Sequence, residues 1–103
     1  MRTFFGEKIM NITVIGAGPG GYEAAIAAAK YGADVTLVEK DEVGGTCLNR
    51  GCIPTKAFLG ASDALDAVEH AKDFGISVEN VSVDYPAIVA RKNKIKDGLV
   101  KGI

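Results

Sequence analysis

Cys47 and Cys52 are the two cysteines of the chain, and they lie close together in the run Cys47-Leu-Asn-Arg-Gly-Cys52. Such a pair can exchange with a substrate dithiol or disulfide through a mixed-disulfide intermediate. Zinc is a weaker interpretation, because it needs about four ligands and the one histidine, His70, lies well beyond Cys52. Two inert buried cysteines remain an alternative. A structural disulfide is disfavoured in a reducing compartment, so the spacing favours a redox pair.

The segments around the cysteines indicate how the two thiols are presented. Residues 41–51 are rich in glycine, asparagine and threonine, which predicts a loop that carries Cys47. Helix is expected to resume near Cys52, with Pro54 tolerated in its first turn. The N-terminus of a helix stabilises a thiolate, and Lys56 adds positive charge one turn later. We therefore expect Cys52 to be a reactive thiol within reach of Cys47.

A glycine-rich run, Gly16-Ala17-Gly18-Pro19-Gly20-Gly21, matches the pattern G-x-G-x-x-G. It follows a β-branched strand expected over residues 11–15 and opens an alanine-rich helix expected over residues 20–31. In this context the first glycine permits a tight turn, the second lets the backbone approach a pyrophosphate, and the third allows close packing of helix on strand. The helix N-terminus supplies unpaired N–H groups for an anion. The run predicts a dinucleotide site.

An acidic residue completes this pattern. A second strand is expected over residues 33–39, and Glu39 ends it about 20 residues after the glycine run. A strand, a helix and a strand within about 30 residues predict a right-handed βαβ unit. The Glu39 carboxylate can accept hydrogen bonds from adenosine ribose hydroxyls and would repel a 2′-phosphate, so FAD or NAD is expected rather than NADP. A glycine turn followed by a surface glutamate is the alternative.

The rest of the chain is expected to be largely helical. Residues 58–74 have helical spacing of apolar positions, and residues 76–83 suit a short extended segment. Asp84 is expected to cap a last helix, whose apolar stripe reaches Ile103. The predicted fold class is α/β, namely the N-terminal βαβ portion of a Rossmann-like FAD/NAD(P)-binding fold followed by helices.

Composition limits the possible partners. The chain has 103 residues, of which 48% are hydrophobic and 24% charged, as in one globular domain. Its net charge of -1 gives no electrostatic reason to expect a nucleic-acid or acidic-membrane partner. No apolar run approaches the roughly 20 residues that cross a bilayer, and the first residues lack the features of a secretory signal. We therefore expect a cytoplasmic protein with no membrane partner, no bound metal and a surface-exposed His70.

The glycine run, Glu39 and the segment Gly44-Gly-Thr-Cys47-Leu-Asn-Arg-Gly-Cys52-Ile-Pro-Thr-Lys56 together resemble the flavin-linked pyridine nucleotide-disulfide oxidoreductases. With Leu48 and Ile53, the cysteine segment is most similar to the members that oxidise dihydrolipoamide. Members that reduce glutathione or mercury more often carry valine at these two positions. The resemblance covers nearly everything from Asn11 to the end of the chain.

The resemblance implies a role for each matching position. Cys47 would exchange with the dithiol substrate, and Cys52 would face the flavin. The positions implied to bind FAD are Gly16, Ala17, Gly18, Pro19, Gly20, Gly21, Glu39, Lys40, Gly45, Thr46, Cys47 and Lys56. In the implied reaction, dihydrolipoamide reduces the disulfide, electrons pass to FAD and NAD⁺ receives hydride. The implied partners are the dihydrolipoyl group of a 2-oxoacid dehydrogenase or glycine-cleavage complex and a second copy in a homodimer.

Later parts of the family's pattern, namely its NAD site and its C-terminal histidine–glutamate base, have no counterpart in these residues. Residues 1–10 are expected to be an N-terminal extension, and residues 11–103 an incomplete N-terminal part of the FAD-binding domain. We therefore expect a truncated chain that is inactive alone and whose strand edges and apolar faces lack neighbours. A related flavin disulfide reductase, or a noncatalytic dinucleotide-binding or thiol-sensing module, remains an alternative.

Overall fold

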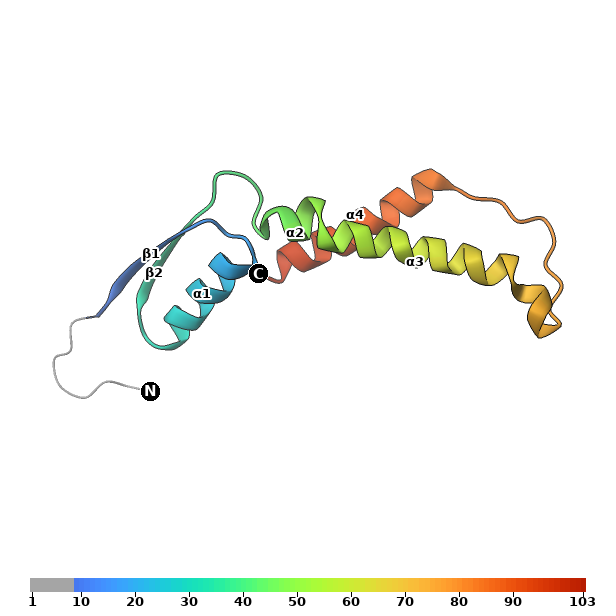
Figure 1. Ribbon diagram of the computed structural model, residues 1–103. Coiled ribbons are helices and arrows are strands. Elements are labelled where there is room, and N and C mark those ends of the chain that lie inside the picture. The colour runs from blue at the N-terminus through green and yellow to red at the C-terminus, as the bar shows by residue number, and fades with distance from the viewer. Residues whose placement is uncertain (1–8) are drawn as a thin grey trace.

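Two parallel strands joined by a helix open the chain in the computed structural model, which describes residues 9–103. β1 (Asn11–Ile15) pairs with β2 (Asp34–Val38), and Asn11 lies opposite Asp34 at the start of the register. α1 (Pro19–Lys30) connects the strands and packs on one face of the pair (Figure 1). The predicted strands and helix are therefore confirmed to within one residue at each end.

Four helical segments follow the βαβ unit: α2 (Gly45–Arg50), α3 (Cys52–Glu69), the 3-10 turn η1 (Ala71–Phe74) and α4 (Tyr85–Lys101). α3 begins at Cys52, as predicted. The helical run ends at Gly75, which has a φ of +74°, a conformation that favours glycine. α4 returns along α3, so the two helices lie side by side as a long hairpin (Figure 1).

The short helix α2 corrects one prediction. The composition of residues 41–51 predicts a loop, yet Gly45–Arg50 is helical and Cys47 lies on it. The reason is tertiary contact, because Leu48 and Asn49 are both buried. The Asn49 side chain also donates two hydrogen bonds to carbonyl groups at the start of the helix. Such contacts override a weak local propensity.

The connection from η1 to α4 has no regular secondary structure. Residues 76–83 pair with no strand among residues 9–103, so the predicted extended segment forms no β-ladder. The predicted cap at Asp84 is confirmed, since its Oδ1 accepts the backbone N–H of Ala87 at 3.0 Å. Pro86 lies in the first turn of α4, where its missing N–H leaves no hydrogen bond unmade.

The buried core is made mostly of alanine side chains. The buried hydrophobic residues among those described are Ala17, Ala25, Leu48, Ala57 and Ala71. The radius of gyration is 21.4 Å, whereas a compact domain of about 100 residues has one of about 13 Å. The βαβ unit lies at one end of the molecule and the helical hairpin extends to the other (Figure 1). The elements are therefore strung out along one axis rather than wrapped around a common core.

Large apolar side chains remain exposed both in the βαβ unit and in the helical part of the molecule. Ile15 on β1 is 86% exposed, and Phe74 in η1 is 81% exposed. The outer edges of β1 and β2 pair with no other described strand, as the sequence predicts for a sheet without neighbours. Of the predicted extension over residues 1–10, residues 1–8 lie outside the part that the structure describes. Along residues 9–103, no helix combines the length and apolarity that a membrane crossing requires.

Candidate functional site

The glycine-rich turn between β1 and α1 has the geometry that its sequence predicts. Gly16 has a φ of +100°, which side chains other than glycine rarely adopt. Its N–H donates to the carbonyl of Val38 at 2.7 Å, so the turn is tied to the end of β2. The first glycine of the run therefore makes the tight turn that brings the chain from the strand into the helix.

The last glycine of the run makes close packing possible. A Cβ atom at Gly21 would overlap the carbonyl oxygen of Gly16 and approach the Val14 side chain to 3.7 Å. No side chain fits there without moving α1 away from β1. By contrast, a Cβ at Gly20 would meet nothing within 4 Å. The predicted role of the third motif glycine in helix–strand packing is confirmed.

Glu39 lies at the end of β2, and its carboxylate is bound by backbone amides. Its Oε2 accepts the N–H of Ala17 at 2.7 Å, and its Oε1 accepts the N–H groups of Lys40 at 2.8 Å and Asp41 at 3.0 Å. Hydrogen bonds to the ionised form favour it, so the Ala17 amide first, and then that of Asp41, hold the pKa of Glu39 below its ordinary value. The carboxylate thus anchors the glycine-rich turn, and Glu39 is also one of the residues that line a hollow beside that turn.

The cysteine segment lies directly against the glycine-rich turn. The Gly44 N–H donates to the carbonyl of Ala17 at 2.7 Å. A Cβ at Gly45 would lie 2.8 Å from the Cα of Gly18, so the two backbones approach as closely as glycine allows. Ala17, between these contacts, has no exposed surface. The two motifs that the sequence separates by more than 20 residues therefore form one site.

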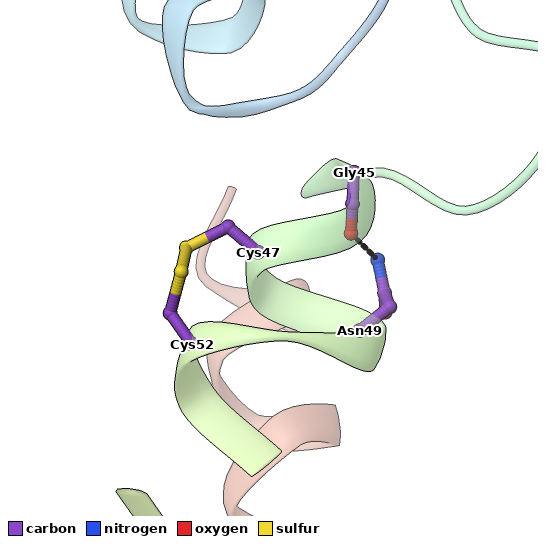
Figure 2. Close-up of a disulfide and its surroundings, with 4 residues drawn as sticks. All are labelled: Gly45, Cys47, Asn49 and Cys52. Carbon is purple, nitrogen blue, oxygen red and sulfur yellow. Dashed lines mark hydrogen bonds between the residues drawn. A yellow bond between two sulfur atoms is a disulfide. The ribbon is translucent and has the colours of Figure 1, made fainter. Parts of the chain in front are cut away.

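Cys47 and Cys52 form a disulfide, with their Cα atoms 4.6 Å apart (Figure 2). Cys47 is on α2, which corrects its predicted place in a loop, and it is half-buried. Cys52 is the first residue of α3, as predicted, and it is exposed. The first turn of α3 carries no acidic residue, and Lys56 follows on the exposed surface one turn later. The disulfide therefore links the third residue of α2 to the first residue of α3, so that one sulfur lies at a helix N-terminus.

Asn49 is a residue of this site that the sequence alone does not single out. It lies between the two cysteines and is 7% exposed. Its Nδ2 donates to the carbonyls of Val43 and Gly45, each at 3.0 Å (Figure 2 shows the bond to Gly45). An asparagine within a helix often bonds to the backbone, which is the one signal that could have drawn attention to it.

A hollow of about 510 Å³ opens beside the glycine-rich turn and α2. It is lined by Ile15, Gly16, Val38, Glu39, Lys40, Asp41, Glu42, Gly45, Thr46 and Arg50. At its rim the Arg50 guanidinium pairs with the Asp41 carboxylate at 2.8 Å, both side chains being about half exposed. Five of the predicted cofactor-binding residues border this one space, namely Gly16, Glu39, Lys40, Gly45 and Thr46. Cys47, Lys56 and the glycine-run residues from Ala17 to Gly21 do not line it. A larger apolar hollow of about 560 Å³ lies between α3 and α4 and shares no lining residue with it.

His70 lies away from this site. It is exposed at the end of α3, and its Nδ1 lies 2.9 Å from the carbonyl oxygen of Asp66, which agrees with the predicted surface position. Within residues 9–103, no three histidine, cysteine or acidic side chains are grouped so as to hold a metal ion.

Comparison with known proteins adds to this geometry. A family model described as pyridine nucleotide-disulphide oxidoreductase matches residues 10–101. The dihydrolipoyl dehydrogenase of Chlamydia trachomatis is 57% identical over 97 residues, covering 90% of the chain and 21% of that protein. The enzyme of the same name from Acholeplasma laidlawii is 50% identical, covering 94% of the chain and 29% of that protein. The one from Bacillus subtilis is 45% identical, covering 91% of the chain and 21% of that protein. The chain spans about a fifth of the length of the first of these relatives.

A solved structure shares the fold. The HOCl-induced flavoprotein disulfide reductase RclA of Escherichia coli, as its Cu(II) complex, aligns with a TM-score of 0.61 and 31% sequence identity. The match covers 93% of the chain and 18% of that protein. The arrangement of βαβ unit and helical hairpin is thus found at one part of a much longer flavoprotein.

Proposed function

Since the chain belongs to the pyridine nucleotide-disulphide oxidoreductase family, we propose that it supplies the FAD-binding turn and the exchangeable disulfide of a dihydrolipoyl dehydrogenase. The full-length protein would oxidise dihydrolipoamide to lipoamide with NAD⁺. The observation that carries the proposal is the position of the Cys47–Cys52 disulfide. Cys52 begins α3, and Cys47 lies on α2, whose first residue, Gly45, approaches Gly18 of the glycine-rich turn. The relatives at 45% to 57% identity, all named dihydrolipoyl dehydrogenase, support this choice of substrate.

The residues present fit the nucleotide part of FAD. The packing of Gly21 on Gly16 brings the first turn of α1 close to β1, and no side chain caps the free N–H groups of that turn. Those N–H groups suit a pyrophosphate. We assign FAD binding to Gly16, Ala17, Gly18, Pro19, Gly20, Gly21, Glu39, Lys40, Gly45, Thr46, Cys47 and Lys56. FAD, when bound, supplies the hydride chemistry, and these residues orient it.

The disulfide carries out the thiol exchange. A substrate thiolate attacks the Cys47 sulfur, which breaks the Cys47–Cys52 bond and releases Cys52 as a thiolate. The second thiol of the substrate then attacks the substrate's first sulfur, which is bonded to Cys47 in the mixed disulfide, and this step releases Cys47. The substrate loses two electrons to the cysteine pair; one of its protons goes to solvent and the other to Cys47. The product is a cyclic disulfide, as lipoamide requires.

The assignment of the two sulfurs follows from their surroundings. Cys52 begins α3, and the partial positive charge of a helix N-terminus favours the thiolate that the first step releases. Lys56 adds a positive charge on the next turn. Cys52 is an exposed residue, which leaves it accessible to a flavin ring. We therefore assign Cys52 to the flavin side and Cys47 to the substrate side.

The partners of this reaction follow from the same proposal. The substrate would be the dihydrolipoyl group of a 2-oxoacid dehydrogenase or glycine-cleavage complex, and the full-length protein would work as a homodimer in the cytoplasm. The relatives named dihydrolipoyl dehydrogenase support the dihydrolipoyl group as the substrate.

Substitution of either cysteine in the full-length protein tests the proposal. We expect Cys47→Ser and Cys52→Ser each to lower NAD⁺-linked oxidation of dihydrolipoamide by about 100-fold or more, since neither variant can form the disulfide. Gly60→Ala on α3 is the control and should keep activity, because a Cβ there meets nothing within 4 Å. Activity retained by both serine variants would remove the proposed role.

A related disulfide reductase is the second candidate, and the fold shared with the flavoprotein disulfide reductase RclA favours it. A substrate panel separates the two candidates. A dihydrolipoyl dehydrogenase should turn over dihydrolipoamide far faster than it reduces glutathione disulfide or Hg²⁺. The reverse order would assign the chain to the second class.

A further inference from the structure

Asn49 is the buried polar side chain among the described residues, and it lies between the two cysteines. Both hydrogens of its amide are used, since Nδ2 donates to the carbonyls of Val43 and Gly45 at 3.0 Å each. Figure 2 shows this side chain reaching back along α2, on the side of the helix away from the disulfide. The residue therefore holds the segment that precedes Cys47 from within the cysteine run itself.

The other half of this amide is unsatisfied. Asn49 Oδ1 is buried and has no hydrogen-bond partner in the protein, a situation that costs free energy. Turning the amide over does not relieve it, because the oxygen would then face the two carbonyl oxygens and the amide hydrogens would lose both acceptors. The unsatisfied oxygen lowers the stability that an asparagine gives at this position. The two hydrogen bonds that its Nδ2 donates are therefore a better explanation for an asparagine at position 49 than stability of the fold.

The two carbonyls that Asn49 binds belong to the junction between the two motifs. Gly44, between them, donates its N–H to the carbonyl of Ala17, and Gly45 abuts Gly18. The glycine-rich turn thus holds this junction from one side and Asn49 holds it from the other. On the far side of α2, the disulfide joins Cys47 to the first residue of α3.

We propose that Asn49 is a positioning residue for the redox disulfide. By fixing residues 43–45, it holds α2 so that the Cα of Cys47 stays 4.6 Å from that of Cys52, within the range from which a disulfide closes. The same two bonds hold α2 against the glycine-rich turn, so the disulfide and the nucleotide site keep one relative position. The inference rests on the redox role proposed for the cysteine pair.

The test measures the thiol–disulfide equilibrium of the full-length protein in glutathione buffers, with alkylation of free thiols and mass spectrometry. We expect Asn49→Leu, which fills a similar volume without donors, to lower the equilibrium constant for closing the Cys47–Cys52 disulfide about tenfold. For a two-electron couple, that change corresponds to about 30 mV. FAD should also bind more weakly in this variant, because α2 is no longer held against Gly18.

Two further variants separate positioning from general destabilisation. Ala71→Gly removes a buried methyl group in η1, away from the cysteines, and should lower the unfolding temperature without moving the equilibrium. Asn49→Ser keeps one short donor, is less disruptive than Asn49→Leu, and should give an intermediate shift even if the leucine variant does not fold.

The outcomes divide clearly. An equilibrium constant within twofold of the native value in Asn49→Leu, or in Asn49→Ser if that alone folds, would overturn the inference. An equal shift in Ala71→Gly would overturn it as well, because the effect would then be general. If the native cysteines do not exchange with glutathione at all, the proposed redox function fails, and that result is distinguishable from either of these.

Discussion

The carboxylate of Glu39 accepts the backbone N–H of Ala17 at 2.7 Å, which joins the end of β2 to the turn after β1. The same carboxylate binds the amides of Lys40 and Asp41, where the chain leaves the sheet toward the cysteines. Ala17 in turn accepts the N–H of Gly44 through its carbonyl. A single acidic side chain thus organises the glycine-rich turn and its approach to the cysteine helix. Contact with a ribose would be an additional role.

Replacing Glu39 by glutamine tests this organising role. We expect Glu39→Gln to lower the unfolding temperature and to weaken FAD binding about tenfold, because the neutral amide is a weaker acceptor than a carboxylate. Glu23→Gln on the exposed surface of α1 is the matched control and should change neither quantity. To separate the turn from the ribose, binding is repeated with FAD that lacks the adenosine 2′-hydroxyl. If Glu39→Gln still binds this analogue more weakly than the native protein does, the loss comes from the glycine-rich turn. If the two proteins bind the analogue equally well, Glu39 acts through contact with the ribose alone.

The lowered pKa of Glu39 predicts a pH dependence. The pKa of Glu39 is lower in the folded protein than in the unfolded chain, where it is near 4.5. Its carboxylate therefore stabilises the fold fully at a pH above 4.5, and this stabilisation is lost as the pH falls through the pKa of the folded protein. We therefore expect the difference in unfolding temperature between the native protein and Glu39→Gln to be constant above about pH 5.5 and to shrink steadily below about pH 4.5. Thermal unfolding followed by circular dichroism measures it. A difference that grows with acidity would contradict the assigned direction.

The two adjacent glycines that open α1 should respond very differently to alanine. In Gly21→Ala the new Cβ overlaps the Gly16 carbonyl oxygen, so α1 must move from β1 at a cost of about 1–3 kcal/mol. Gly20→Ala meets nothing within 4 Å and should leave the unfolding temperature unchanged or raise it slightly, since alanine favours helix. Differential scanning calorimetry of the full-length protein compares them. Equal effects of the two substitutions would exclude the close packing at Gly21.

A second pair of glycines tests the contact between the two motifs. Gly45→Ala places a Cβ 2.8 Å from the Cα of Gly18 at a φ of +64°, so both sterics and backbone strain oppose it. We expect a loss of about 2 kcal/mol or more together with weaker FAD binding, measured by denaturation and by flavin fluorescence. Gly60→Ala, inside α3 with free space around it, should gain about 0.5–1 kcal/mol. Unchanged FAD binding in Gly45→Ala would show that the approach of the motifs is not needed.

Features set by neighbouring residues were predictable from the sequence. The βαβ unit follows from a β-branched strand, an alanine-rich helix and a glycine turn, each of which depends on local backbone preference. The start of α3 at Cys52 and the cap at Asp84 are local in the same sense. The chain has two cysteines, so a disulfide within it can join only Cys47 to Cys52.

Features set by contacts between distant segments were decided only by the tertiary structure. The composition of residues 41–51 indicates a loop, but burial of Leu48 and Asn49 makes a helix of it and moves Cys47 onto that helix. The bond between Glu39 and Ala17, and the approach of Gly45 to Gly18, join residues more than 20 positions apart. Local preference contains no information on such pairs, because their free energy arises only when the chain has brought them together. The sequence by itself predicted which residues carry the chemistry, and the tertiary structure determined that the glycine-rich turn and the cysteine segment lie against each other.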